Sequence, residues 1–401
     1  MDVLPQSAGP APQKAPAGKT PAGKTLPGFL LSGFLMALPG AILPVWGFYR
    51  DPPAFATIGT YFLSLAGGML VSVWIARRFV SNPSRCSRPV LACSVAAVAL
   101  VALALVPPLA AAYWRSFGLA ILGMGAGLFN LSMFAGLPAG CAKNPAAAVN
   151  RGGIWYGLGC LTAALVAAIT LGFSSTTATL LVAAVPGVFG ILYLRGALSS
   201  ARDSAGEKPG GGPEGPAPLA ALLFALLLFF QFGNEWSVAG WLPLFLIRRI
   251  GFSPGAALRS LALYWLFLLL GRLVAVAALP RLHHGVLLGG SILAALFGCL
   301  LLDFTNNGFG ATGGILLVGS GYASVYPLVA EAIGQRFPFY RPTFFGRIFS
   351  LGTLGGLLAP ASIGYAAARF DIGVTMGVPL IGTCLVLLLI VSIWIEARFA
   401  A

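Results

Sequence analysis

Long apolar runs separated by short polar breaks dominate the pattern of this 401-residue chain. An α-helix needs about 20 mostly apolar residues to cross the hydrocarbon core of a bilayer, and twelve runs reach that length. The runs cover approximately residues 27–49, 54–77, 88–109, 115–138, 150–172, 176–198, 219–247, 257–279, 284–303, 309–333, 344–368 and 373–396. The pattern therefore predicts an all-α membrane protein with twelve transmembrane helices.

Two longer polar segments divide the chain. Residues 1–26 are rich in Pro, Ala, Gly and Lys and contain no apolar run, so they are predicted to form a disordered tail. Residues 199–218 are rich in Gly and Pro, so they are predicted to be a flexible linker between the sixth and seventh spans. This division predicts an N-terminal six-helix bundle over 27–198 and a C-terminal six-helix bundle over 219–398.

Composition and charge support a membrane protein and set its orientation. The chain is 58% hydrophobic and only 8% charged, which excludes a soluble domain of this length. Seventeen of the 24 Lys and Arg residues fall on the side of the membrane that holds the termini, and six fall on the other side. Positive loops favour the cytoplasm, so both termini are predicted to be cytoplasmic. The same distribution accounts for the net charge of +14 without a nucleic-acid partner.

The two predicted bundles share motifs at a nearly constant offset. The matched pairs are Pro44 with Pro243, Gly125 with Gly319, and Arg151 with Arg347, which are 199, 194 and 196 residues apart. Three matches in the same order, with the linker between them, indicate a duplicated six-span unit. Two such halves related by an axis along the membrane normal are the layout of one large class of transporters.

The seventh span contains the only acidic residue that lies deep inside an apolar run, Glu235. A carboxylate at this depth needs a partner, a water-filled cavity or a proton. It is therefore a candidate proton-coupling group or ligand for a substrate hydroxyl, or else a structural carboxylate paired with Asn234, Gln231 or Arg272. Gln231 lies four residues before Glu235 and shares its helix face, so these side chains can form one polar patch.

Other candidates are spread over several spans. Arg272 can pair with Glu235, contact an anionic substrate or extend to a cytoplasmic gate. Asn130 can bond substrate or a neighbouring helix. The aromatic candidates for substrate stacking, some of which could instead form an interfacial belt, are Trp236, Trp241, Trp265, and Tyr322 with Tyr326 on one face of the tenth span.

Basic residues near the cytoplasmic ends of the spans are candidates for a gate. Glu331 is expected to form an ion pair there with Arg77, Arg78 or Arg151, and the repeat adds Arg347 as the counterpart of Arg151. The six cysteines form no CxxC motif or Cys/His cluster, so no metal site is predicted. The spans also lack a nucleophile with a base, so neither an enzyme nor a cofactor is expected.

Several local motifs resemble one family of transporters. The seventh span carries Gly233-Asn234-Glu235-Trp236 and then Gly240-Trp241, and the eighth carries Tyr264-Trp265 and then Gly271-Arg272. Through these motifs and its glycine-rich tenth and eleventh spans, the chain resembles the fucose-permease-like branch of the major facilitator superfamily over residues 27–398. The chain departs from the family in lacking an Asp in the loop 76–85, and in lacking a carboxylate in its first six spans.

The resemblance implies two six-helix bundles around a central cavity. It implies secondary active transport of a sugar or similar small polar solute by alternating access, coupled to H⁺ or Na⁺ through Glu235. It also implies a monomer in the lipid bilayer of a bacterial inner membrane. An exporter of drugs or lipids from the same superfamily is the alternative.

Overall fold

The computed structural model describes eight stretches of the chain and is helical throughout them. These stretches are residues 22–50, 54–79, 87–106, 111–134, 145–198, 219–278, 284–337 and 342–399, and no strand occurs among them. The linker predicted at 199–218 and the first 21 residues of the predicted tail lie outside these ranges. The last residues of the predicted tail begin the first helix, which starts at Ala22.

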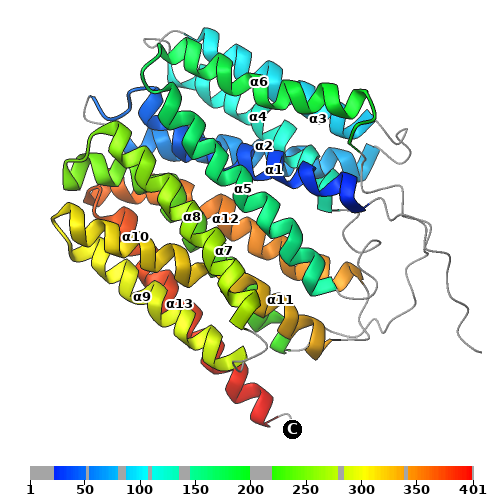
Figure 1. Ribbon diagram of the computed structural model, residues 1–401, viewed down its shortest axis with the longest axis vertical. Coiled ribbons are helices and arrows are strands. Elements are labelled where there is room, and N and C mark those ends of the chain that lie inside the picture. Colours follow the sequence, from blue (N-terminus) through cyan, green and yellow to red (C-terminus); the bar gives the residue numbers. More distant parts are fainter. Residues whose placement is uncertain are drawn as a thin grey trace, which may run out of the picture.

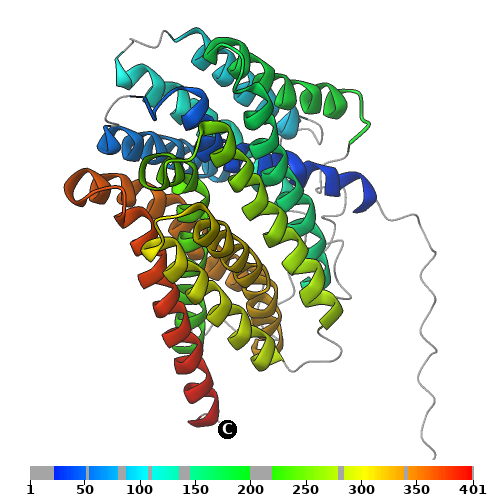
Figure 2. The ribbon, with the colours of Figure 1, turned by 60° about the vertical axis from the view of Figure 1, so that its left-hand side comes forward.

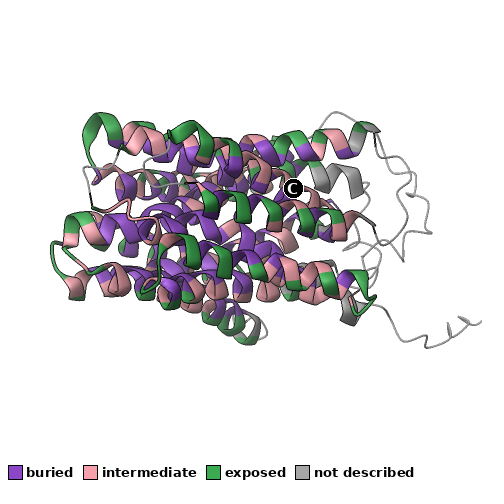
Figure 3. Ribbon diagram, turned by 90° about the horizontal axis from the view of Figure 1, so that it is seen from above, coloured by how far each residue is buried: buried purple, intermediate pink, exposed green. Residues whose placement is uncertain are grey.

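Twelve spans in the described part of the chain are long and apolar enough to cross a membrane, which confirms the predicted number. The helices that form them are α1 (Ala22–Val45), α2 (Phe55–Phe79), α3 (Ser87–Leu105), α4 (Ala112–Phe134), α5 (Pro145–Thr170), α6 (Ser175–Leu194), α7 (Leu219–Phe245), α8 (Pro254–Ala278), α9 (His284–Phe304), α10 (Gly308–Ala323), α11 (Val325–Arg336), α12 (Pro342–Phe370) and α13 (Val374–Phe399). Large apolar side chains such as Trp74 and Phe304 cover the outside, while buried residues gather in the middle (Figure 3).

Two spans depart from a regular α-helix. The seventh continues from α7 into one π-helical turn, η2 (Leu246–Ile250), which ends at Gly251 in the left-handed conformation. The tenth span is broken at Ser324 into α10 and α11. Pro327 has no N–H to donate to the Ala323 carbonyl, which explains the break. The prediction that Tyr322 and Tyr326 share one helix face is therefore wrong, because the break lies between them.

The helices of each half pack mainly on one another. We call α1–α6 the N-terminal half and α7–α13 the C-terminal half; they lie one above the other in Figure 1. In the N-terminal half α1 packs on α5, α2 on α4, and α3 on α4 and α6. In the C-terminal half α7 packs on α12 and α13, while α10 packs on α8 and α9.

Glycines repeat the same helix contacts in the two halves. A Cβ at Gly159 of α5 would strike the Leu30 carbonyl of α1, and a Cβ at Gly355 of α12 would strike the Phe229 carbonyl of α7. Likewise, Gly123 packs on the α2 backbone and Gly319 packs on the α8 backbone. The glycine match is thus corrected by two residues: Gly123, not Gly125, corresponds to Gly319.

The halves meet through α2 with α12, α5 with α8, and α1 with α7. We call the end where α1 ends and α2 begins the loop end, and the end where α1 begins and α13 ends the terminus end (Figure 2). Contact is closest near the loop end. A Cβ on Gly364 of α12 would lie 2.4 Å from the Gly59 Cα of α2, and one on Gly40 of α1 would lie 2.4 Å from the Ala239 carbonyl oxygen of α7. The two halves therefore touch backbone to backbone here.

The first prediction tests this contact with two alanine substitutions on the same helix. A Cβ at Gly59 would lie 2.8 Å from the Ala361 carbonyl oxygen, whereas a Cβ at Gly67 meets nothing within 4 Å. Overpacking costs roughly 1–3 kcal/mol, so Gly59→Ala is expected to lower the thermal unfolding temperature of the purified protein. It is also expected to lengthen distances between spin labels placed across the two halves at the loop end.

Gly67→Ala is the matched control and is expected to leave both measurements unchanged or to raise stability slightly, because alanine favours a helix over glycine. Equal effects of the two substitutions would contradict close packing of the halves at Gly59.

Candidate functional site

The centre of the molecule contains a buried ion pair. Glu235 on α7 and Arg272 on α8 are 4% and 5% exposed, and they are the only buried charged residues in the part of the chain that the structure describes. Arg272 Nη2 lies 3.6 Å from Glu235 Oε1. Of the partners considered from the sequence, the structure therefore gives Glu235 an arginine. Neutralising the carboxylate in this way offsets part of its desolvation cost.

Arg272 also connects the two halves. Its Nη1 donates a hydrogen bond of 2.8 Å to the Gly153 carbonyl of α5, in the N-terminal half. A Cβ at Gly153 would lie 3.2 Å from the same nitrogen, so glycine leaves room for the guanidinium to reach the backbone. One side chain thus joins α7, α8 and α5 across the interface that must rearrange if the halves move.

Several buried polar atoms around this pair make no hydrogen bond within the described residues. They are both polar atoms of the Gln231 amide, Glu235 Oε2, Arg272 Nε and Trp265 Nε1. The Gln231 side chain is completely buried. Buried polar groups are nearly always hydrogen-bonded in proteins, so a polar ligand or water is the expected partner for this group of atoms.

Aromatic rings enclose the polar group. Trp236 contacts Tyr156 of the N-terminal half edge to face, with ring centroids 6.1 Å apart, and Trp265 at 5.5 Å. The Tyr264 hydroxyl donates to the Glu235 backbone carbonyl. Flat rings beside amide, carboxylate and guanidinium groups suit a solute with both a weakly polar face and hydrogen-bonding groups.

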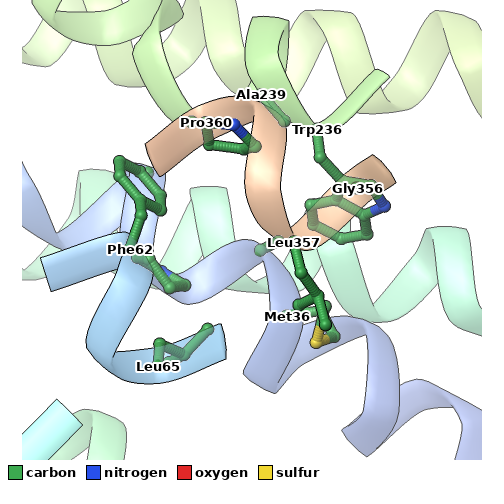
Figure 4. A pocket seen from close by; sticks show the side chains of 12 residues that line it. Met36, Phe62, Leu65, Trp236, Ala239, Gly356, Leu357 and Pro360 are labelled. Atoms are coloured by element: carbon green, nitrogen blue, oxygen red, sulfur yellow. The ribbon is translucent and has the colours of Figure 1, made fainter. Parts of the chain in front are cut away.

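A cavity of about 20 Å³ lies beside Trp236, between the halves. Figure 4 shows its walls: Met36, Phe62 and Leu65 of the N-terminal half face Trp236, Leu357 and Pro360 of the C-terminal half. A buried water needs roughly 10–15 Å³ by this measure. This space therefore holds about one water, and a larger solute needs the halves to separate.

Trp241 seals the loop-end side of this region. It is completely buried, packs between Phe55 and Phe62 of α2, and donates from its indole N–H to the Pro360 carbonyl. We expected Trp241 to line the cavity beside the carboxylate. The structure instead places it in the closed contact between the halves, about two helical turns beyond Glu235.

Asn234 and Tyr322 belong to a different polar cluster. The Asn234 amide lies 3.4 Å from the Thr383 hydroxyl of α13, and the Tyr322 hydroxyl lies 2.7 Å from that same oxygen. Cys299 of α9 joins the cluster through Tyr322. These residues hold the C-terminal half together and turn away from Arg272, so the structure does not bring them into the patch predicted around Glu235.

Two further predicted ligands have partners outside the ion pair. Asn130 of α4 accepts a hydrogen bond from Ser32 of α1, within the N-terminal half. Tyr326 of α11 packs between Phe232 and Phe349. The bond from Ser32 means that Asn130 joins two helices, which was the alternative to substrate binding.

The predicted gate takes a different form. Glu331 pairs with His284 at 3.1 Å, so the expected pair with Arg78 or Arg151 is wrong. Glu331 lies on α11, which packs beside α9, and α9 begins at His284. Three of the proposed gate arginines, Arg78, Arg151 and Arg347, are exposed. The Arg77 side chain lies outside the described residues.

Sequence reasoning missed the contribution of α5. Neither Tyr156 nor Gly153 is assigned a role in the site from the sequence alone. The adjacent glycines 152 and 153, one turn before Tyr156, are the signal that this helix lets another group approach its backbone. No group of three or more His, Cys, Asp or Glu able to hold a metal occurs in the described residues.

Comparison with known proteins gives consistent matches. The family model of the Major Facilitator Superfamily matches residues 141–360. An uncharacterized MFS-type transporter of Yersinia pestis is 30% identical over 202 residues, a match that spans half of this chain and half of the relative.

Two solved structures share the fold. A variant of the E. coli fucose:proton symporter FucP has a TM-score of 0.60 at 13% identity, covering 93% of this chain and 98% of its own. A variant of the nucleoside transporter NupG has a TM-score of 0.64 at 13% identity, covering 94% and 99%.

The second prediction concerns the ion pair and is a double-substitution cycle. Removing one partner of a buried pair typically costs about 3–5 kcal/mol. Glu235→Gln is expected to cost more stability than Arg272→Gln, because a carboxyl left alone can take up a proton whereas a guanidinium cannot lose one. The double variant is expected to be more stable than Glu235→Gln alone.

Thermal unfolding at pH 5.5 and 7.5 measures the cycle. Lower pH should favour the Arg272→Gln variant, since protonation neutralises its unpaired carboxyl. Additive losses in the double variant would show that the two side chains are not coupled.

Proposed function

Because this chain belongs to the Major Facilitator Superfamily, we propose that it is a secondary active transporter of a sugar or similar small polar solute. One observation carries the proposal: a buried ion pair of the C-terminal half bonds to the N-terminal half through Arg272, beside buried polar atoms that have no partner in the described chain. Ionisable residues inside a membrane protein usually mark substrate or ion pathways. The names of its two structural neighbours, a fucose:proton symporter and a nucleoside transporter, support this class of solute.

Transport would proceed by alternating access. The halves close tightly at the loop end through Gly59, Gly364 and Trp241. Opening this end requires these contacts to separate, while the Arg272 bond to Gly153 lies nearer the terminus end. The two sets of contacts would form and break in alternation around a site near Glu235, as in rocking of one half against the other.

Coupling would operate through Glu235. A bound proton removes the charge that holds Arg272 beside α7, and so changes the relative free energy of the two orientations. A ligand shifts such an equilibrium only by its difference in affinity for the two states. We propose H⁺ as the coupling ion, with Na⁺ as the alternative. The proposed setting is a monomer in a bacterial inner membrane with both termini cytoplasmic.

The third prediction is uptake by purified protein in liposomes with an imposed pH gradient. Uptake of at least one solute from a panel of sugars, polyols and sugar acids is expected to accelerate at least tenfold when the outside is acidic. The Glu235→Gln variant should lose this acceleration, because its side chain cannot take up the proton.

Glu396→Gln is the matched control. Glu396 pairs with Arg336 at 3.0 Å near the end of α13, far in sequence from Glu235 and Arg272. Exposed ion pairs contribute little to stability, so this variant should keep gradient-driven uptake. Gradient-driven movement of lipophilic cations alone would contradict the proposal and favour a drug exporter.

A further inference from the structure

Arg272 presents one edge of its guanidinium without a full set of partners. Nη1 is occupied by the Gly153 carbonyl, Nη2 lies 3.6 Å from Glu235, and Nε makes no hydrogen bond within the described residues. Nε and Nη2 together form the planar two-donor edge that binds a carboxylate through two parallel hydrogen bonds. A contact of 3.6 Å is too long for one of those bonds, so Glu235 does not fill this edge.

The net charge of the site restricts which solutes can bind when Glu235 takes up a proton. Glu235 and Arg272 are the only buried charges in the described chain, so their sum is zero. When Glu235 takes up a proton, Arg272 becomes an unpaired cation inside the membrane, which is costly. A neutral solute leaves that charge unpaired, whereas a solute with one negative charge restores the balance.

Other groups near Glu235 do not supply the missing charge. Tyr156 and Cys160 of α5, Tyr264 of α8 and Tyr326 of α11 lie within electrostatic reach of Glu235. Phenols and thiols in an apolar interior are neutral, and Gln231 carries no charge. Among the described residues around the carboxylate, Arg272 alone is charged at neutral pH.

We infer that the transported solute is a small carboxylate, such as a sugar acid or hydroxy acid, whose carboxylate binds the Nε/Nη2 edge of Arg272 while Glu235 receives a proton. This inference rests on the proposed function and specifies its substrate class. The proton comes from the side from which the solute enters and binds at the Glu235 carboxylate. Substrate carboxylate then replaces Glu235 as the partner of Arg272, and Gln231 and Trp265 are positioned for the hydroxyl groups. Each cycle moves one anion and one proton, so transport is electrically neutral.

Matched pairs of acids and neutral solutes test the inference on the full-length protein. The probes are glycolate with ethylene glycol, glycerate with glycerol, and glucuronate with glucose. Binding is measured by thermal stabilisation at pH 5.5 and 7.5. At least one acid is expected to stabilise the natural protein more than its neutral partner does, and more strongly at pH 5.5.

Variants separate this inference from a merely structural role of the pair. Glu235→Gln leaves Arg272 unpaired, so it should bind the acid with a Kd at least tenfold lower than the natural protein at pH 7.5, and equally at both pH values. Arg272→Gln should lose the preference for the acid, and Arg272→Lys should keep a weakened preference because it retains the charge without the planar edge. The conservative control Glu396→Gln should behave like the natural protein.

A second measurement applies even if Glu235→Gln does not fold. In weakly buffered solution at pH 7.5, the natural protein is expected to take up about one proton for each carboxylate that it binds. Proton release, no change, or equal binding of every acid and its neutral partner overturns the inference. Proton-coupled uptake of neutral sugars without any preference for acids would overturn it while leaving the proposed function intact. If lipophilic cations alone bind, both are overturned.

Discussion

A guanidinium that cannot lose its proton is buried where the two halves of this transporter meet, and much of the site is arranged around that charge. Arg272 has a carboxylate on α7 and a backbone carbonyl on α5 as its partners. Each partner comes from a different half. Because an unpaired charge inside the membrane is costly, any rearrangement of the halves must keep Arg272 supplied with partners. The ion pair is thus a constraint on motion as well as a contribution to stability.

Glycine packing sets where the halves can touch. Gly59, Gly364 and Gly40 allow backbone contact near the loop end, while Gly153 allows Arg272 to reach the α5 carbonyl nearer the other end. Small residues permit such close approach of membrane helices, where dispersion contacts replace the hydrophobic effect as the source of association. The cavity between these two contacts admits about one water. The conformation described is therefore closed around its centre, and solute entry depends on separating one set of contacts.

The buried polar residues of α7 belong to two separate groups of side chains. Gln231 and Glu235 lie one turn apart on α7, and Glu235 faces Arg272 of α8, whereas Asn234 turns toward Thr383 and joins Tyr322 and Cys299. The first group has unsatisfied atoms, and the second is hydrogen-bonded within its own half. Adjacent positions on α7 thus belong to the proposed site and to the internal packing of the C-terminal half, because a step of one residue turns the side chain by about 100°.

The sequence by itself determined the twelve spans, the depth of Glu235 and the candidate status of Arg272. These follow from hydropathy, length and the cost of burying charge, which are properties of each segment alone. Tertiary structure alone decided that Arg272 pairs with Glu235, that Gly153 accepts its second bond, that Trp241 seals the loop end, and that Glu331 meets His284. Those outcomes depend on which helices pack together and where the tenth span breaks, and residues far apart in the chain carry no local signal of their contact.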